Sequence, residues 1–136
     1  MTLPRWMRVA LLATAVMNLG AAIAFLPSGG SVRALAGFPD AGHPLYGTTV
    51  ALFVGLFGVG YLWSGATGRA DRLFIALAAV GKIAFVAILV RLWAGGALPL
   101  RALLVGSGDL AFGALFLAWL FGVGAGPEPM PYGGDR

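Results

Sequence analysis

Four apolar segments dominate the sequence, and each is close to the length that crosses a lipid bilayer. They cover residues 9–26, 46–63, 73–93 and 98–123. A bilayer core of about 30 Å needs about 20 helical residues, and lipid offers no hydrogen-bond partner for an unpaired backbone. The alternating pattern of a membrane β-barrel is absent. We therefore predict an all-α integral membrane protein, an antiparallel bundle of four transmembrane helices.

Composition restricts the classes of partner and site. Charged residues make up 10% of the chain and hydrophobic residues 60%, whereas a soluble domain has about 25% charged residues. The net charge of +4 comes mostly from arginines at the ends of apolar segments, where they meet lipid headgroups. With no cysteine and only one histidine, disulfides and Cys- or His-rich metal sites are excluded. The expected partner is the bilayer, with no nucleic acid and no metal.

The chain reads as one domain with a tail. We predict a single transmembrane domain over residues 1–123 and a flexible Pro- and Gly-rich tail over 124–136. The first connection, 27–45, is long, and a short helical turn is expected within it at 31–37. We interpret the first apolar segment as a retained helix and not as a cleaved signal peptide, because it is longer than a usual signal core.

The arginines predict an orientation in the cell (inner) membrane, since cytoplasmic ends of transmembrane helices are enriched in Lys and Arg. With both termini in the cytoplasm, five arginines lie inside and three outside. The inside set is Arg5, Arg8, Arg69, Arg72 and Arg136, and the outside set is Arg33, Arg91 and Arg101.

Two charges interrupt the last two apolar segments. Lys82 and Asp109 are equidistant along the chain from the Gly95-Gly96 turn, so each lies about 20 Å from it in a helix. A tight turn makes the two helices antiparallel neighbours. A charge at the bilayer centre costs about 2.5–3.5 kcal/mol and normally finds a partner inside the bundle. We therefore predict a Lys82–Asp109 ion pair near the midplane.

Two further polar residues could join that pair. Asn18 lies at similar depth in the first segment, and Thr14 lies one turn away on the same face. Together with Lys82 and Asp109 they form a predicted polar core, either a ligand site or a structural clamp that fixes helix register. The sequence leaves both roles open, together with a proton relay.

Two other patterns border this core. Asp40, His43 and Tyr46 precede or begin the second segment, where they are candidates for closing the outer mouth of the bundle. A surface role for His43 is the simpler alternative. Tyr61 lies nearer the cytoplasmic end of the second segment, where an aromatic residue at the membrane interface is ordinary. Gly47, Ala51 and Gly55 are spaced four residues apart, a small-residue stripe that permits close helix approach.

Several short motifs give the chain a likeness to a known family. They are the Gly/Pro-rich loop after the first segment, Gly58-Val59-Gly60-Tyr61, Gly81-Lys82 and Gly106-Ser107-Gly108-Asp109. With these motifs the chain resembles the DoxX-like group of small four-helix bacterial membrane proteins, some of which are subunits of quinone-linked oxidoreductases. The resemblance implies a four-helix bundle that acts as an accessory subunit or binds a hydrophobic molecule, and it transfers no catalytic residue.

Three functions compete at this point. The first is a membrane protein that binds a hydrophobic ligand, with a quinone or a lipid as candidates, or serves as accessory subunit of a membrane complex. It would act with a membrane-protein partner or as a homo-oligomer, and no cofactor is predicted. The alternative is a proton-coupled transporter or channel for small molecules. The second alternative is an intramembrane acid–base enzyme such as an isomerase, although no nucleophile with an adjacent base is visible and the catalytic residues are unknown.

Overall fold

The computed structural model describes residues 2–122 and is helical almost throughout. Its long helices are α1 (Arg5–Phe25), α3 (Pro44–Thr67), α4 (Arg72–Ala94) and α5 (Leu100–Gly122). A 3₁₀ turn, η1 (Pro27–Gly29), and a short helix, α2 (Gly30–Ala36), follow α1. All four long helices are long and apolar enough to cross a membrane. The protein is thus a multi-pass membrane protein with a helical-bundle fold, as the sequence predicts.

Local sequence signals set the ends of these helices. His43 caps α3 by accepting a hydrogen bond from the Leu45 amide on Nδ1, and Pro44 occupies the first helical position. Asp71 caps α4 in the same way, since its Oδ1 accepts from two backbone amides. Gly68 ends α3 in the left-handed conformation, with a φ of 69°.

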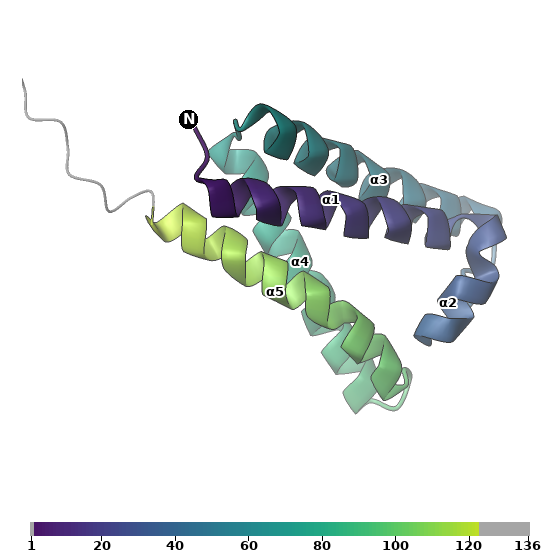
Figure 1. The fold of residues 1–136 in the computed structure, drawn as a ribbon. Helices are drawn as coiled ribbons and strands as arrows, with labels where there is room; N and C mark the ends of the chain where they lie inside the picture. Colours follow the sequence, from purple (N-terminus) through teal and green to yellow (C-terminus); the bar gives the residue numbers. More distant parts are fainter. Residues whose placement is uncertain (1, 123–136) are drawn as a thin grey trace, which may run out of the picture.

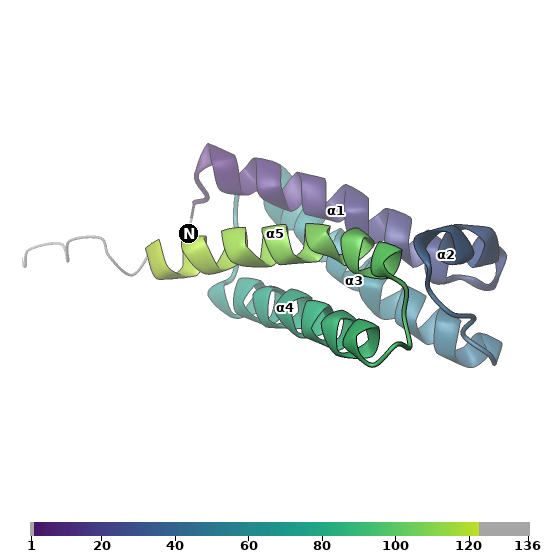
Figure 2. The same cartoon turned by 90° about the horizontal axis from the view of Figure 1, so that it is seen from below.

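The bundle consists of two helical pairs that meet at an angle. α1 packs antiparallel on α3, and α4 packs antiparallel on α5. Figure 1 shows the two pairs close together near the N-terminus and farther apart toward α2 and the α4–α5 turn. Figure 2 shows α2 at the end of the bundle where α1 ends and α3 and α5 begin. We call the end near the N-terminus the closed end of the bundle and the end toward α2 and the α4–α5 turn the open end.

Small residues of α3 bring it close to α1. A Cβ added at Gly47 would lie 2.8 Å from the Phe25 carbonyl oxygen, and one at Gly58 would lie 3.0 Å from Leu19. Of the predicted stripe, Gly47 and Ala51 are buried and Gly55 is half-buried. The buried Gly58 extends the contact beyond the stripe.

Large side chains fill the closed end. Tyr61, Phe116 and Trp119 are almost completely buried there, and the Tyr61 ring lies 5.5 Å from that of Phe74 and 5.7 Å from that of Phe116. The core cluster also contains Leu3, Met7, Leu11, Ala15, Ile75, Ala78 and Ala79.

Arginines near both ends of the bundle join one helix to the C-terminal carbonyls of another. Such contacts give a hydrogen-bond donor to carbonyl groups that have no partner within their own helix. They also place a positive charge at the C-terminal end of the helix, where the helix dipole is negative. Arg8 donates to Gly65 and Ala66 at the end of α3, Arg33 to Ala24 and Leu26 at the end of α1, and Arg72 to Leu120 near the end of α5. These arginines were interpreted from the sequence as headgroup contacts, and the structure adds this second role.

Three sequence predictions differ from the structure in extent. α1 begins four residues before its apolar segment, and α3 begins two residues before its segment and ends four residues after it. These added turns contain polar residues, glycine or proline, which hydropathy alone leaves out. The short helix begins with η1 at Pro27, four residues before the predicted turn. The predicted tail, 124–136, and the position of Arg136 lie outside the described residues.

Candidate functional site

The predicted ion pair is present. Lys82 Nζ lies 2.6 Å from Asp109 Oδ1 and joins α4 to α5. The Lys82 side chain is 5% exposed and that of Asp109 is 19% exposed. Gly113 on α5 permits the close approach of α5 to α4 beside the pair, because a Cβ added there would lie 2.9 Å from Ile83 Cδ1 and 3.4 Å from Lys82 Cβ. The charges are therefore paired inside the bundle, as residues of this type within a membrane require.

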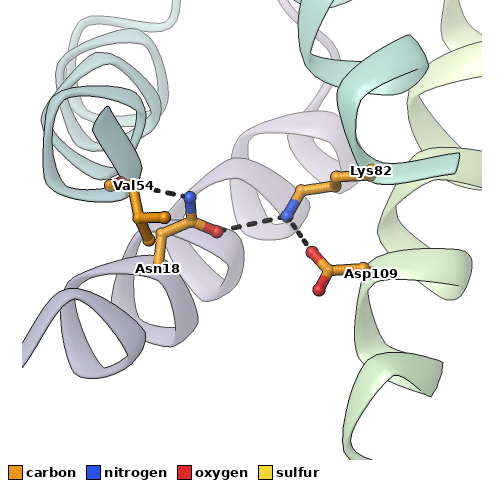
Figure 3. Close-up of polar contacts among 4 residues, drawn as sticks. All are labelled: Asn18, Val54, Lys82 and Asp109. Carbon is orange, nitrogen blue, oxygen red and sulfur yellow. Dashed lines mark hydrogen bonds and ion pairs between the residues drawn. The ribbon is translucent and has the colours of Figure 1, made fainter. Parts of the chain in front are cut away.

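Asn18 extends the pair into a polar chain through all four long helices. Its Oδ1 accepts a hydrogen bond from Lys82 Nζ at 3.1 Å, and its Nδ2 donates to the Val54 carbonyl at 3.3 Å. Figure 3 shows the resulting sequence from Val54 on α3 through Asn18 on α1 and Lys82 on α4 to Asp109 on α5. The predicted participation of Asn18 agrees with this geometry.

Thr14 and Tyr61 lie differently from the sequence interpretation. Thr14 is fully buried, but its Oγ1 has no hydrogen-bond partner among residues 2–122, so it does not join the polar chain. Tyr61 was interpreted as an interfacial aromatic residue and is instead 2% exposed. Lys82 Nζ lies 5.5 Å from the centre of its ring, a distance that suits a cation–π contact.

A cavity of about 340 Å³ lies between the two helical pairs, with the polar chain in its wall. This volume is within the range of small-molecule pockets, about 300–1,000 Å³. Every long helix contributes to the lining, which is mostly apolar. Its aromatic members are Phe25, Phe38, Phe53, Phe57, Tyr61 and Phe85, and its polar members besides Tyr61 are Asn18, Lys82 and Asp109.

The aromatic residues of the cavity wall were not predicted from the sequence, although the spacing of three of them indicates a shared face. Phe53, Phe57 and Tyr61 recur at four-residue spacing and so share one face of α3. At the open end, the ring of Phe38 lies 6.0 Å from that of Phe25 and 6.5 Å from that of Phe85. Phe38 belongs to the loop after α2, and no periodicity could assign it to this wall.

The three residues predicted at the outer mouth are not in the cavity lining. Asp40 is 88% exposed and lies 3.7 Å from Arg33. His43 caps α3, and its ring lies edge-on to that of Tyr46 at 6.5 Å. This places all three at the bundle end that carries α2, and their role at a mouth stays a prediction.

The polar groups available at the site are the carboxylate of Asp109, the ammonium of Lys82, the amide of Asn18 and the phenol of Tyr61. Within residues 2–122, no group of three or more His, Cys, Asp or Glu side chains could hold a metal ion. The polar side chains can bind and orient a polar group, or exchange a proton with it.

Comparisons with known proteins add no family to this geometry. A scan against family models, a search of curated proteins and a search of solved structures each found no match to the chain. The resemblance to the DoxX-like group thus stays a prediction.

Proposed function

We propose that this protein binds a small, mostly hydrophobic molecule in the cavity between its two helical pairs. The observation that carries the proposal is the composition of the cavity wall: aromatic and aliphatic side chains surround one cluster of convergent polar groups. This is the usual composition of a small-molecule site, in which apolar contact supplies affinity and a few polar groups fix orientation. A quinone or a membrane lipid fits this description, and both occur in the cell membrane where we place the protein.

Ligand binding in this cavity is compatible with two ways of working. The protein could bind the molecule alone, or could present it to a membrane-protein partner as an accessory subunit of the kind that the DoxX-like resemblance implies. The transport alternative has less support, because the cavity wall contains a single acid and a single lysine. The enzyme alternative gains one observation, the position of Tyr61 in the wall beside Lys82.

Native mass spectrometry of the protein, extracted gently from its own membrane, tests the proposal. We expect a discrete small molecule bound to the unaltered protein. Gly81→Leu should remove it, because Gly81 lines the cavity and an added Cβ meets no atom within 4 Å, so the larger side chain fills space without a backbone clash.

Gly20→Leu is the matched control. Gly20 is also a helical glycine with open space around an added Cβ, and it is not part of the cavity lining. The bound molecule should stay in this variant. A protein that carries no small molecule, or one whose molecule survives Gly81→Leu, would contradict the proposal. A co-purifying protein partner without a ligand would favour the accessory-subunit function alone.

A further inference from the structure

The charge balance of the cavity limits the kind of molecule that it can hold. Of the residues that line it, only Lys82 and Asp109 are charged, and their side chains already pair at 2.6 Å. The net charge of the lining is therefore zero. An ionic head group entering this site would leave one charge without a counter-charge in a low-dielectric environment, which is strongly unfavourable.

The same groups retain some hydrogen-bonding capacity. The Lys82 ammonium has three N–H groups, of which Asn18 and Asp109 accept one each. Only one oxygen of Asp109, Oδ1, takes part in the described contacts, and the side chain is 19% exposed. Lys82 and Asp109 can therefore donate one hydrogen bond to a ligand and accept another. An uncharged oxygen group, a hydroxyl or a carbonyl, matches that capacity.

The cavity also has a side that faces the surrounding lipid. Val50 and Phe53 on α3 and Leu77 on α4 line it and are 41%, 58% and 55% exposed. All three lie within helices long enough to span a membrane. In a bilayer their exposed surface meets acyl chains, so a molecule dissolved in the bilayer reaches the cavity between α3 and α4 without crossing water.

We propose that the ligand is a bilayer-dissolved lipid with an uncharged hydroxyl or carbonyl head, which enters between α3 and α4. Its head lies at Lys82 and Asp109, and its apolar body lies along Phe53, Phe57 and Phe85. This inference rests on the proposed function and narrows it. Fatty-acid anions and alkylammonium ions are excluded, because both charges of the site are already paired with each other. Zwitterionic phospholipids are excluded as well, because their two head-group charges would leave water and find no free counter-charge in the site.

Photolabelling in lipid nanodiscs tests the inference. Four diazirine probes share one dodecyl chain and differ in the head: a hydroxyl, a sulfonate, a trimethylammonium and a phosphocholine. Mass spectrometry then compares adducts on the cavity residues with adducts on lipid-facing residues such as Val9 and Leu62, which are 59% and 45% exposed and do not line the cavity. That ratio corrects for unequal partition of the probes into the bilayer. We expect this ratio to be about tenfold or more higher for the alcohol than for each charged probe. An uncompensated charge inside a membrane is costly enough to reduce binding by at least that factor.

Two variants and one control test where the probe binds and which charge its head can carry. Gly81→Leu should abolish cavity labelling by the alcohol, whereas Gly20→Leu should leave it unchanged. Asp109→Asn keeps an acceptor for Lys82 but leaves a net positive charge, so cavity labelling by the sulfonate should rise about tenfold relative to the alcohol. The probe comparison on the unaltered protein stands whether or not the Asp109 variant folds.

The possible results separate this inference from the proposed function. If a charged or zwitterionic probe labels the cavity as strongly as the alcohol, the uncharged-head inference is overturned while ligand binding stands. If every probe labels the cavity no more than the lipid-facing residues, ligand binding itself is contradicted. Alcohol labelling that persists in Gly81→Leu would place the bound probe elsewhere and overturn the inference.

Discussion

The side-chain amide of Asn18 joins α1 to α4, because its Oδ1 accepts a hydrogen bond from Lys82 Nζ at 3.1 Å. Lys82 is also paired with Asp109, so this one contact connects the α1–α3 pair of helices to the α4–α5 pair. The polar chain passes beside the cavity between the two pairs. The groups that hold the pairs in register are thus also the groups that a ligand would meet.

Asn18→Leu should loosen the two helical pairs relative to each other. The change removes the bonds to Lys82 and Val54, and hydrogen bonds within membranes contribute about 0.6 kcal/mol each, up to about 1.7. The chain has no cysteine, so introduced cysteines can be spin-labelled specifically. Labels at Ser31→Cys in α2 and Ala97→Cys in the α4–α5 turn measure the distance between the two helical pairs at the open end. We expect a broader distance distribution between the labels in Asn18→Leu.

Ser107→Ala is the control for that experiment. Ser107 is a polar residue of α5 whose hydroxyl donates only to its own helix, at Leu104. Its removal should leave the distance distribution unchanged. A distribution as narrow in Asn18→Leu as in the parent would mean that apolar packing alone sets the angle between the pairs.

The Lys82–Asp109 pair should behave as a buried pair in a stability measurement. Asp109→Leu leaves the ammonium of Lys82 without an anion and should lower the free energy of unfolding by about 3 kcal/mol. Adding Lys82→Met should restore most of that loss, because apolar residues replace both charges. Unfolding in mixed micelles of increasing denaturing detergent measures both variants. A double variant as unstable as the single one would show that the pair is not the source of the loss.

The architecture and the pair were predictable because each depends on local or nearly local rules. Hydropathy and length define the four long helices. The Gly95-Gly96 turn forces α4 and α5 to be neighbours, and a fixed rise per residue then places Lys82 and Asp109 at one depth. Asn18 was also predictable, since a polar side chain at that depth in lipid needs a partner.

The arrangement of the helical pairs was not predictable in the same way. The angle between the pairs depends on the sizes of side chains that meet across the chain, with Tyr61, Phe116 and Trp119 at one end and the Phe25, Phe38 and Phe85 rings at the other. No short turn connects these residues, so periodicity gives no register between them. The cavity between the pairs depends on that angle, so its shape could not be predicted from the sequence. The same reason explains why Tyr61 was placed at the interface and not in the core.

The orientation of the bundle is open to a direct test. Thr2 and Arg69 form a backbone bridge, so the N-terminus and the α3–α4 connection lie at the same end. The arginine distribution predicts that this end is cytoplasmic. A membrane-impermeant maleimide applied to intact spheroplasts should label Ala97→Cys, at the opposite end, and should label Thr2→Cys only after lysis. The reverse labelling pattern would show that the bundle is inserted the other way.

Arg33 should be among the most important residues outside the polar chain. Its side chain is 8% exposed, and its Nη1 donates to the carbonyls of Ala24 and Leu26, both at 2.7 Å, so that it connects α2 to the end of α1. Hydrogen bonds to charged groups contribute about 1.5–3 kcal/mol, so Arg33→Met should lower the free energy of unfolding by about that amount. Asp40→Ala should change it little, because Asp40 is 88% exposed and surface ion pairs contribute about 0–1 kcal/mol. Equal losses in the two variants would mean that the ion pair, and not the bonds to the end of α1, gives Arg33 its effect.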